Sequence, residues 1–407
     1  MGYWKEKWMD EYERVYSAPD GRFVCPACIT DRHLAAAVEA HVDDRPCSYC
    51  GRKPAAELSV LMDEIVVALG ADYTDPVHEL PYESREGGYQ GVVRDGSDLV
   101  DDLEPWTEND DLLADASRAF ATTAWCERDY FALKPYQSLS FGWKGFSEQV
   151  KHRTRFLFLQ ELKGDGDPND IPPGRMLDAL GRLFVEFSLL ADIPAGTEFV
   201  RARIVATGER PSSAADLGTA PVDRAVRPNR MSPAGIPMFY GAVDENTAVL
   251  ETYQPERGGD HEIALARFRT VRSLKILDLK TLPRIPSVFD SENREKRQPL
   301  SFLRDFEREF TRPVARDDKA HVEYVPTQVV TEFVRHRLLT PDSVKLDGIR
   351  YRSSHAKAST AIVLFADPEH CGPRPNRSPL DPVPFLELID VRYAPPDQFA
   401  DLWRASK

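Results

Sequence analysis

The side chains best suited to acid–base and anion-binding chemistry gather between Arg227 and Glu251. The Tyr240 phenol ends a short apolar run, and the Glu251 carboxylate follows eleven positions later, in a segment that begins with helix-capping residues. Asp244 is a favourable N-cap residue, and acidic groups in a first turn suit the positive end of the helix dipole. A strand, turn and helix in this order can aim the phenol and the carboxylate into one cleft. The alternative is an ordinary solvated glutamate on a helix.

A second set of reactive side chains has the C-x2-C-x18-C-x2-C spacing of a structural zinc site. Its members are Cys25, Cys28, Cys47 and Cys50. Each two-residue gap lets a pair of sulfurs face one metal ion, and Gly51 follows the second pair. Four thiolates leave no open position for water, so bound Zn2+ would stabilise the fold rather than catalyse a reaction. His33 and His41 lie between the pairs, and we do not expect them to be ligands.

The composition limits the classes of function. The chain has 407 residues, enough for two or three domains, and its net charge is −14, from 52 basic and 66 acidic residues. This acidic balance makes nucleic-acid binding an unfavourable hypothesis, because such binding depends on neutralising phosphates. No apolar run is long enough to span a membrane, and the first residues lack an apolar signal-peptide core. The sequence therefore predicts a soluble cytoplasmic protein.

Apolar periodicity predicts that the first half of the chain is mainly helical. Residues 55–70 have a helical pattern that ends at a glycine, and residues 71–110 are Gly- and Asp-rich, which predicts an exposed acidic connector. Further helices are predicted over 112–131, 143–162 and 175–191. We expect a helical bundle behind the cysteine segment.

The periodicity changes after residue 197 to a mixture of short strands and helices that is not in regular βαβ order. Strands are predicted over 199–205, 238–240, 360–365 and 385–394, with two more within 261–283. The residue pattern predicts a charged helical insertion with i,i+4 surface pairs over 289–314 and another helix over 324–338. This pattern indicates an α+β domain, and neither a Rossmann nor a P-loop glycine motif is present.

The central segment resembles the RES family, which is named for an Arg, a Glu and a Ser that recur in its members. The family pattern R-x-S-P-x-G-x-P-x-x-Y-x-A, followed by T-A-x-x-E, is present in this sequence. Its residues are Arg230, Ser232, Pro233, Gly235, Pro237, Tyr240, Ala242, Thr247, Ala248 and Glu251. The resemblance covers roughly residues 195–370.

Two flanking segments look like the family segments that carry the other two residues of its name, the Arg and the Ser. Upstream, the predicted strand FVRARIV supplies the Arg, with Arg201 the better match and Arg203 the alternate. Downstream, the segment DGIRYRSSH supplies the Ser, with Ser353 favoured over Ser354. Three segments in the family order are far more specific than any one of them.

The resemblance implies an ADP-ribosyltransferase-like fold and an activity that consumes NAD+. Cleavage of the nicotinamide–ribose bond passes through an oxocarbenium-like state, which the Glu251 carboxylate can stabilise. Arg201 and Ser353 are the other expected catalytic residues. Arg201 is also expected to bind the pyrophosphate, with Arg230 as a second candidate for that role. Arg203 is a further cofactor-binding candidate, and Tyr240 is expected to contact the nicotinamide end.

The helical half resembles the HEPN-like module found in front of some RES domains, in architecture more than in motif. HEPN ribonucleases use an Arg-x(4–6)-His pair, and residues 51–190 contain none. Two pairs with that spacing fall in the C-terminal domain instead, Arg316/His321 and Arg350/His355. A regulatory or oligomerising role is therefore expected of this half.

The complete prediction is a chain of three regions. Residues 1–54 form a zinc-knuckle region, residues 55–194 a helical HEPN-like module with an acidic connector, and residues 195–407 the RES domain. We expect an NAD+-consuming toxin or phage-defence effector that the zinc and helical half regulates.

Several points stay open at this stage. The acceptor of the ADP-ribosyl group is water, inorganic phosphate or a protein side chain, and the last would make the protein a protein ADP-ribosyltransferase. The alternative from another class is a non-catalytic, zinc-dependent nucleotide-binding scaffold. The resemblance implies an antitoxin or trigger protein as a partner, and it would be encoded separately, because no helix-turn-helix is evident in this sequence. Homo-oligomerisation is open.

Overall fold

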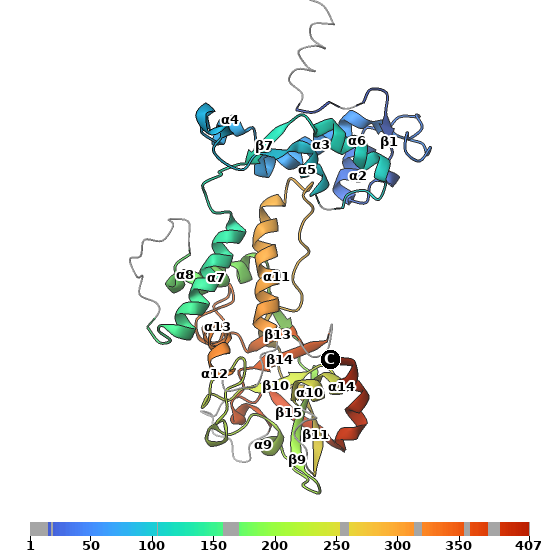
Figure 1. The fold of residues 1–407 in the computed structure, drawn as a ribbon. Helices are drawn as coiled ribbons and strands as arrows, with labels where there is room; N and C mark the ends of the chain where they lie inside the picture. Colours follow the sequence, from blue (N-terminus) through green and yellow to red (C-terminus); the bar gives the residue numbers. More distant parts are fainter. Residues whose placement is uncertain are drawn as a thin grey trace, which may run out of the picture. The chain divides into compact units, whose positions relative to one another are not determined.

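The computed structural model describes residues 15–17, 19–103, 105–157, 171–252, 260–312, 320–353, 359–372 and 383–406. Its internal contacts divide the chain into two compact units, each described by itself below (Figure 1). Unit 1 is residues 1–134 together with 285–298, and unit 2 is residues 135–284 together with 299–407. The predicted borders at 54/55 and 194/195 stay predictions. In the described part of the chain, no helix is long and apolar enough to cross a membrane.

Unit 1 is built mainly from short helices, with small two- and three-stranded sheets between them. Its helices are α2 (Arg32–Glu39), α3 (Leu58–Asp72), α4 (Pro76–Glu79), α5 (Gly96–Asp101) and α6 (Asp110–Phe120). Its strands are β1 (Phe23–Val24), β2 (Ala56–Glu57), β3 (Tyr73–Thr74), β4 (Tyr82–Glu83), β5 (Gly88–Tyr89), β6 (Arg94–Asp95) and β7 (Ala124–Glu127). The helix predicted over 55–70 is α3, which runs past Gly70 to Asp72.

The prediction that residues 71–110 form an exposed acidic connector is wrong. It contains β3 to β6, α4 and α5, and its Leu99, Val100 and Trp106 are buried in the hydrophobic core of unit 1. Acidic residues here cap helices instead of extending the chain: Asp95 accepts a backbone hydrogen bond from Ser97 at the start of α5. The segment is therefore an integral part of the unit.

The helix predicted over 112–131 is correct only for its first half. Helix α6 ends at Phe120, where the Thr123 hydroxyl donates a 2.7 Å hydrogen bond to the Phe120 carbonyl. Residues 124–127 then form β7, which pairs with both β3 and β6. Threonines and Trp125 favour an extended chain, and the available partner strands outweigh the helical pattern.

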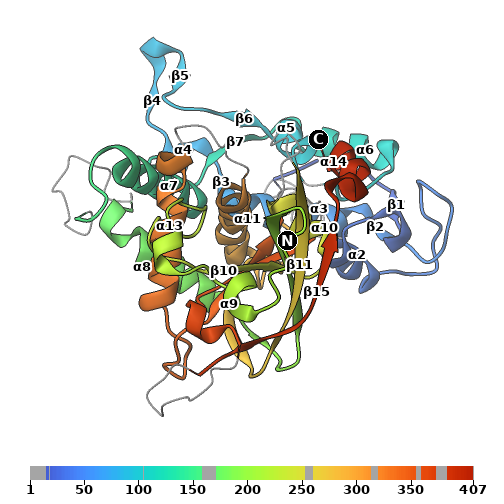
Figure 2. The ribbon, with the colours of Figure 1, turned by 90° about the horizontal axis from the view of Figure 1, so that it is seen from below.

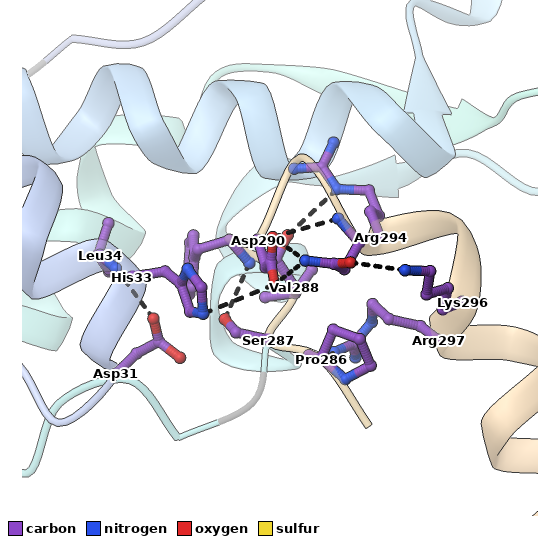
Figure 3. A network of polar contacts seen from close by, with 12 residues as sticks. Asp31, His33, Leu34, Pro286, Ser287, Val288, Asp290, Arg294, Lys296 and Arg297 are labelled. Carbon is purple, nitrogen blue, oxygen red and sulfur yellow. Dashed lines mark hydrogen bonds and ion pairs between the residues drawn. The ribbon is translucent and has the colours of Figure 1, made fainter. Parts of the chain in front are cut away.

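Residues 285–298 complete the core of unit 1, although they lie far from the rest of it in the sequence. Val288 and Phe289 are each 8% exposed and belong to the same buried cluster as Leu34 of α2. Figure 3 shows the polar contacts around them: His33 Nε2 lies 3.6 Å from an Asp290 carboxylate oxygen. Arg294 donates to the Val288 carbonyl at 3.2 Å. We call residues 285–298 the docking segment.

Unit 2 combines a large sheet with helices. Its helices are α7 (Pro135–His152), α8 (Pro173–Glu186), α9 (Ala214–Leu217), α10 (Glu245–Thr252), α11 (Arg297–Thr311), α12 (Ala320–Glu323), α13 (Val325–His336) and α14 (Ala400–Ser406). Helix α11 begins within the docking segment and continues in unit 2. The charged helix predicted over 289–314 therefore starts at Arg297, because the residues before it pack into the core of unit 1.

The sheet of unit 2 has eight strands in the order β15-β11-β9-β10-β14-β13-β12-β8. The strands are β8 (Leu190–Ile193), β9 (Glu198–Ala206), β10 (Phe239–Ala242), β11 (His261–Thr270), β12 (Leu274–Asp278), β13 (Gly348–Arg352), β14 (Thr360–Leu364) and β15 (Leu386–Ala394). Strands β12 and β13 are parallel, and the other neighbours are antiparallel. Figure 2 shows the long strands β11 and β15 side by side. This mixed sheet confirms the predicted α+β C-terminal domain.

The two halves of the sheet are joined by very little strand pairing. Strand β9 pairs with β11 over its whole length, from Ala206 opposite His261 to Glu198 opposite Arg269. It pairs with β10 only at Val200, which faces Ala242. We call this weakly paired boundary between β9 and β10 the seam.

Two predicted helices of unit 2 have different limits in the structure. Helix α7 begins at Pro135 and ends at His152, and residues 158–162 of the predicted helix lie outside the described residues. Helix α8 ends at Glu186, not at 191, because Ser188 adopts a left-handed conformation with φ of 54°. Residues 190–193 then form the edge strand β8, which pairs with β12.

Candidate functional site

A carboxylate and a hydroxyl from distant parts of unit 2 meet at the centre of the candidate site. The Ser353 hydroxyl, just after β13, donates a 2.5 Å hydrogen bond to Oε1 of Glu251, near the end of α10. Ser353 is buried and Glu251 is half-buried. Asp244 fixes the start of α10 by accepting a 2.8 Å hydrogen bond from the Thr247 backbone, as its capping position predicts.

The Tyr240 side chain lies on the same face of the sheet as the side chain of Tyr351 in β13. It pairs across to Val363 of β14, and Val363 pairs to Ile349 of β13. Directly opposite residues in antiparallel strands point to one face, and so do residues two positions apart, such as Ile349 and Tyr351. The structure therefore brings the phenols of Tyr240 and Tyr351 to one side of the β10-β14-β13 group.

The Tyr240 phenol is held by Ser232, a residue of the same family pattern. The two hydroxyls lie 2.9 Å apart, and burial raises the pKa of Tyr240 to about 12. The nearby positive charge of Arg201 opposes that shift. Tyr240 therefore remains an uncharged phenol at neutral pH.

Arg201 lies at the seam. Its Nη1 donates a 2.9 Å hydrogen bond to the Tyr240 carbonyl, and its guanidinium carbon lies 5.5 Å from the centre of the Phe239 ring. Arg201 alternates with Val200 and Ala202, so it approaches the seam from the face opposite to the Tyr240 side chain. Burial lowers the pKa of Arg201, and among the described residues no carboxylate pairs with it. A half-buried cation of this kind suits an anionic ligand.

The other two predicted arginines have different surroundings. Arg203 donates to the Asp216 backbone carbonyl of α9. Arg230 donates to the backbone carbonyls of Phe310, at 3.3 Å, and Arg312, where α11 ends. Neither guanidinium is hydrogen-bonded to Tyr240, Glu251 or Ser353 in the described part of the molecule. Ser354, the alternate to Ser353, lies outside the described residues.

Sequence reasoning missed Tyr351, which lies two residues before Ser353 on β13. Burial raises the pKa of Tyr351 well above its ordinary value, and the negative charge of Glu251 raises it further. The positive charge of Arg230 acts in the opposite direction. The available signal was the position of Tyr351 two residues before Ser353 within the segment that resembles the family's Ser segment.

The four predicted cysteines come together in unit 1. Their Sγ atoms all lie within 4.8 Å of one another, with Cys25 3.3 Å from Cys50 and Cys28 3.8 Å from Cys47. A disulfide would need about 2.05 Å, whereas four sulfurs about 2.3 Å from one zinc ion are separated by about 3.8 Å. Gly51 has φ of 73°, which explains the glycine after the second pair. The donor set fits a tetrahedral thiophilic metal.

Comparisons with known protein families agree with this layout. The family described as the RES domain matches residues 203–385, and the family described as HEPN/RES N-terminal domain 1 matches residues 40–163. Neither the curated proteins nor the solved structures contain a match to the chain. The RES match includes Arg203, Glu251 and Ser353, and begins just after Arg201. RES domains are associated with enzymes that act on NAD, and this chain carries a RES domain behind a HEPN/RES N-terminal domain 1.

Proposed function

We propose that this protein is an NAD+-consuming enzyme that cleaves the nicotinamide–ribose bond. The observation that carries the proposal is the Ser353–Glu251 hydrogen bond of 2.5 Å within a RES domain. It fixes a half-buried carboxylate where a positively charged sugar could be stabilised. Arg201 reaches the seam from the other face of the sheet and has no carboxylate partner among the described residues, which supports a ligand that carries phosphate groups.

In the proposed reaction the bond between the ribose C1 and the nicotinamide nitrogen breaks, and its electron pair leaves with the nicotinamide. The positive charge of the nicotinamide ring is thereby neutralised, and charge develops on the ribose carbon and ring oxygen. Glu251 stabilises this charge, while Ser353 keeps the carboxylate oriented. A nucleophile then bonds to C1 and loses its proton.

Each remaining predicted residue has a proposed role in binding. Arg201 has guanidinium N–H groups beyond the one used by Tyr240, and these can bind the pyrophosphate. Tyr240 contacts the nicotinamide end. Arg230 and Arg203 are further proposals for cofactor binding, and each also donates from one guanidinium nitrogen to a backbone carbonyl.

The proposal extends to the setting of the enzyme. The cysteine cluster would hold one structural Zn2+, and the N-terminal unit would regulate NAD+ consumption by a toxin or phage-defence effector in the cytoplasm. The docking segment supports a functional link, because residues inside the RES match are part of the core of unit 1. A separate antitoxin or trigger protein would complete the control. Homo-oligomerisation of the chain stays open.

The test of the function is product identification after incubation with NAD+, with and without inorganic phosphate. ADP-ribose plus nicotinamide in both buffers would identify a hydrolase, and a sugar phosphate formed only with phosphate would identify a phosphorylase. Nicotinamide release with the ADP-ribosyl group bound to protein would identify a protein ADP-ribosyltransferase. NAD+ that binds but stays intact would favour the nucleotide-binding scaffold instead.

A further inference from the structure

The Tyr351 side chain combines a buried ring with a hydroxyl that forms no hydrogen bond within the described part of the chain. Tyr351 is 7% exposed and lies within β13, between β14 and β12. No other described residue forms a hydrogen bond with its hydroxyl. A buried donor without a partner costs free energy, so such a group is uncommon unless something else satisfies it.

Three other tyrosines of this protein have hydroxyl groups that are hydrogen-bonded to protein side chains. The Tyr240 hydroxyl lies 2.9 Å from Ser232, Tyr49 donates to Asp115 at 2.9 Å, and Tyr136 donates to Asp305 at 2.7 Å. The Tyr351 hydroxyl oxygen also keeps some solvent-accessible surface, unlike the fully covered, unpartnered polar atoms of the described core. A ligand or a water molecule can therefore reach it.

The position of Tyr351 relates this donor to the candidate site. Ser353 directly follows β13, and its backbone N–H still donates to the Ser359 carbonyl, so it continues the extended chain. Tyr351 is two positions before it, and the two side chains therefore point to the same face. Ser353 holds the Glu251 carboxylate, and the charges of Glu251 and Arg230 both act on the Tyr351 phenol. Two observations therefore coincide: an unpaired donor and its location beside the carboxylate.

We propose that Tyr351 contacts the substrate, donating its hydroxyl proton to an oxygen atom on the nicotinamide–ribose half of the dinucleotide. This inference rests on the proposed function and adds the residue that recognises that half. The reacting ribose is expected next to Glu251, and Tyr351 lies two residues before the serine that holds this carboxylate, close enough for the Glu251 charge to act on its phenol. The phosphates, by contrast, are expected at Arg201.

The chemistry of the phenol suits this role. Burial and the Glu251 carboxylate both keep the proton on Tyr351 at neutral pH. An uncharged O–H can pair with a ribose hydroxyl or a carboxamide oxygen without placing a second negative charge beside Glu251. A lysine here would instead neutralise the carboxylate on which the reaction depends.

The test compares full-length wild-type protein with Tyr351→Phe, which keeps the ring and removes the hydroxyl. We expect kcat/KM for NAD+ and the affinity for nicotinamide mononucleotide to fall about tenfold, the value of one hydrogen bond of roughly 1.4 kcal/mol. Affinity for ADP, measured by calorimetry, should stay unchanged. The matched control is Tyr393→Phe, which removes a phenol that donates to the Pro211 carbonyl on the edge strand β15 and should leave both affinities unchanged.

The outcomes separate this inference from the proposed function. Wild-type protein that neither binds nor consumes NAD+ would overturn both. Wild-type protein that consumes NAD+, with Tyr351→Phe equal to it in kcat/KM and in mononucleotide affinity, would overturn the role of Tyr351 alone. An equal loss of affinity for ADP and for the mononucleotide would indicate a structural role and would also contradict the inference.

Discussion

The Ser353 hydroxyl donates a 2.5 Å hydrogen bond to the Glu251 carboxylate, across 102 positions of sequence. The contact joins the end of α10, which carries Glu251, to the residue that follows β13. We propose that Ser353 orients the carboxylate. Short charge-assisted hydrogen bonds of this kind are stronger than neutral ones.

Replacing Ser353 by Ala should slow NAD+ consumption without abolishing substrate binding. The variant leaves Glu251 in place but removes a hydrogen bond to a charged acceptor, worth roughly 1.5–3 kcal/mol or about 10- to 100-fold in rate. Steady-state kinetics should show most of the loss in kcat. An unchanged kcat would contradict the orienting role.

Arg201 and Arg203 form a matched pair that tests which arginine serves the ligand. Arg201→Ala should raise KM for NAD+ about 10- to 100-fold, because it removes a half-buried, charge-assisted donor at the seam. Arg203→Ala removes a guanidinium that contacts the Asp216 carbonyl, and it should raise KM less than Arg201→Ala does. A larger effect at Arg203 would reverse the assignment.

The cysteine cluster should bind about one zinc ion per chain, measurable by elemental analysis of the purified protein. Cys28→Ser should lose that metal and lower the thermal stability of unit 1, because structural zinc contributes directly to folding free energy. Cys126→Ala is the control, since Cys126 is buried in the same unit but lies outside the cluster. Equal zinc content in wild type and Cys28→Ser would be incompatible with a four-thiolate site.

The docking segment should be needed for the stability of unit 1. Phe289→Ala empties a buried site and should cost roughly 3–5 kcal/mol of unfolding free energy. Phe131→Ala, at a side chain that is 72% exposed, should change it by less than about 0.5 kcal/mol. Urea unfolding of the full chain can compare the two variants, and similar losses in both would show that Phe289 does not stabilise the unit.

The packing of the docking segment into unit 1 also determines which truncated proteins are suitable for assay. A fragment of residues 195–407 contains Val288 and Phe289 without the core residues of unit 1 that cover them. Assays of NAD+ consumption are therefore best made on the full chain.

Features set by short-range chemistry could be predicted from the sequence. The cysteine spacing is local, so the cluster was predictable, and so was Asp244 as the cap of α10. Glu251 and Ser353 were found through the family resemblance. Their hydrogen bond follows from the pairing of β10, β14 and β13, which periodicity does not specify.

Features set by distant partners could not be predicted. The docking segment has the charges of a surface helix, and nothing in its own residues indicates that Val288 and Phe289 pack against α2 and its neighbours. The left-handed Ser188 likewise ends α8 where apolar periodicity alone continues the helix. The role suggested for Tyr351 depends on burial and on the absence of a hydrogen-bond partner, neither of which the sequence reveals.

The most direct test of the central claim is a time course of nicotinamide release from NAD+ by wild-type protein and Glu251→Gln, followed by NMR. The glutamine keeps the shape of the side chain and its ability to accept the Ser353 hydrogen bond, but removes the negative charge. We predict nicotinamide release by the wild type and loss of that release in a variant that still folds and still binds NAD+. Equal release by both proteins would contradict the account.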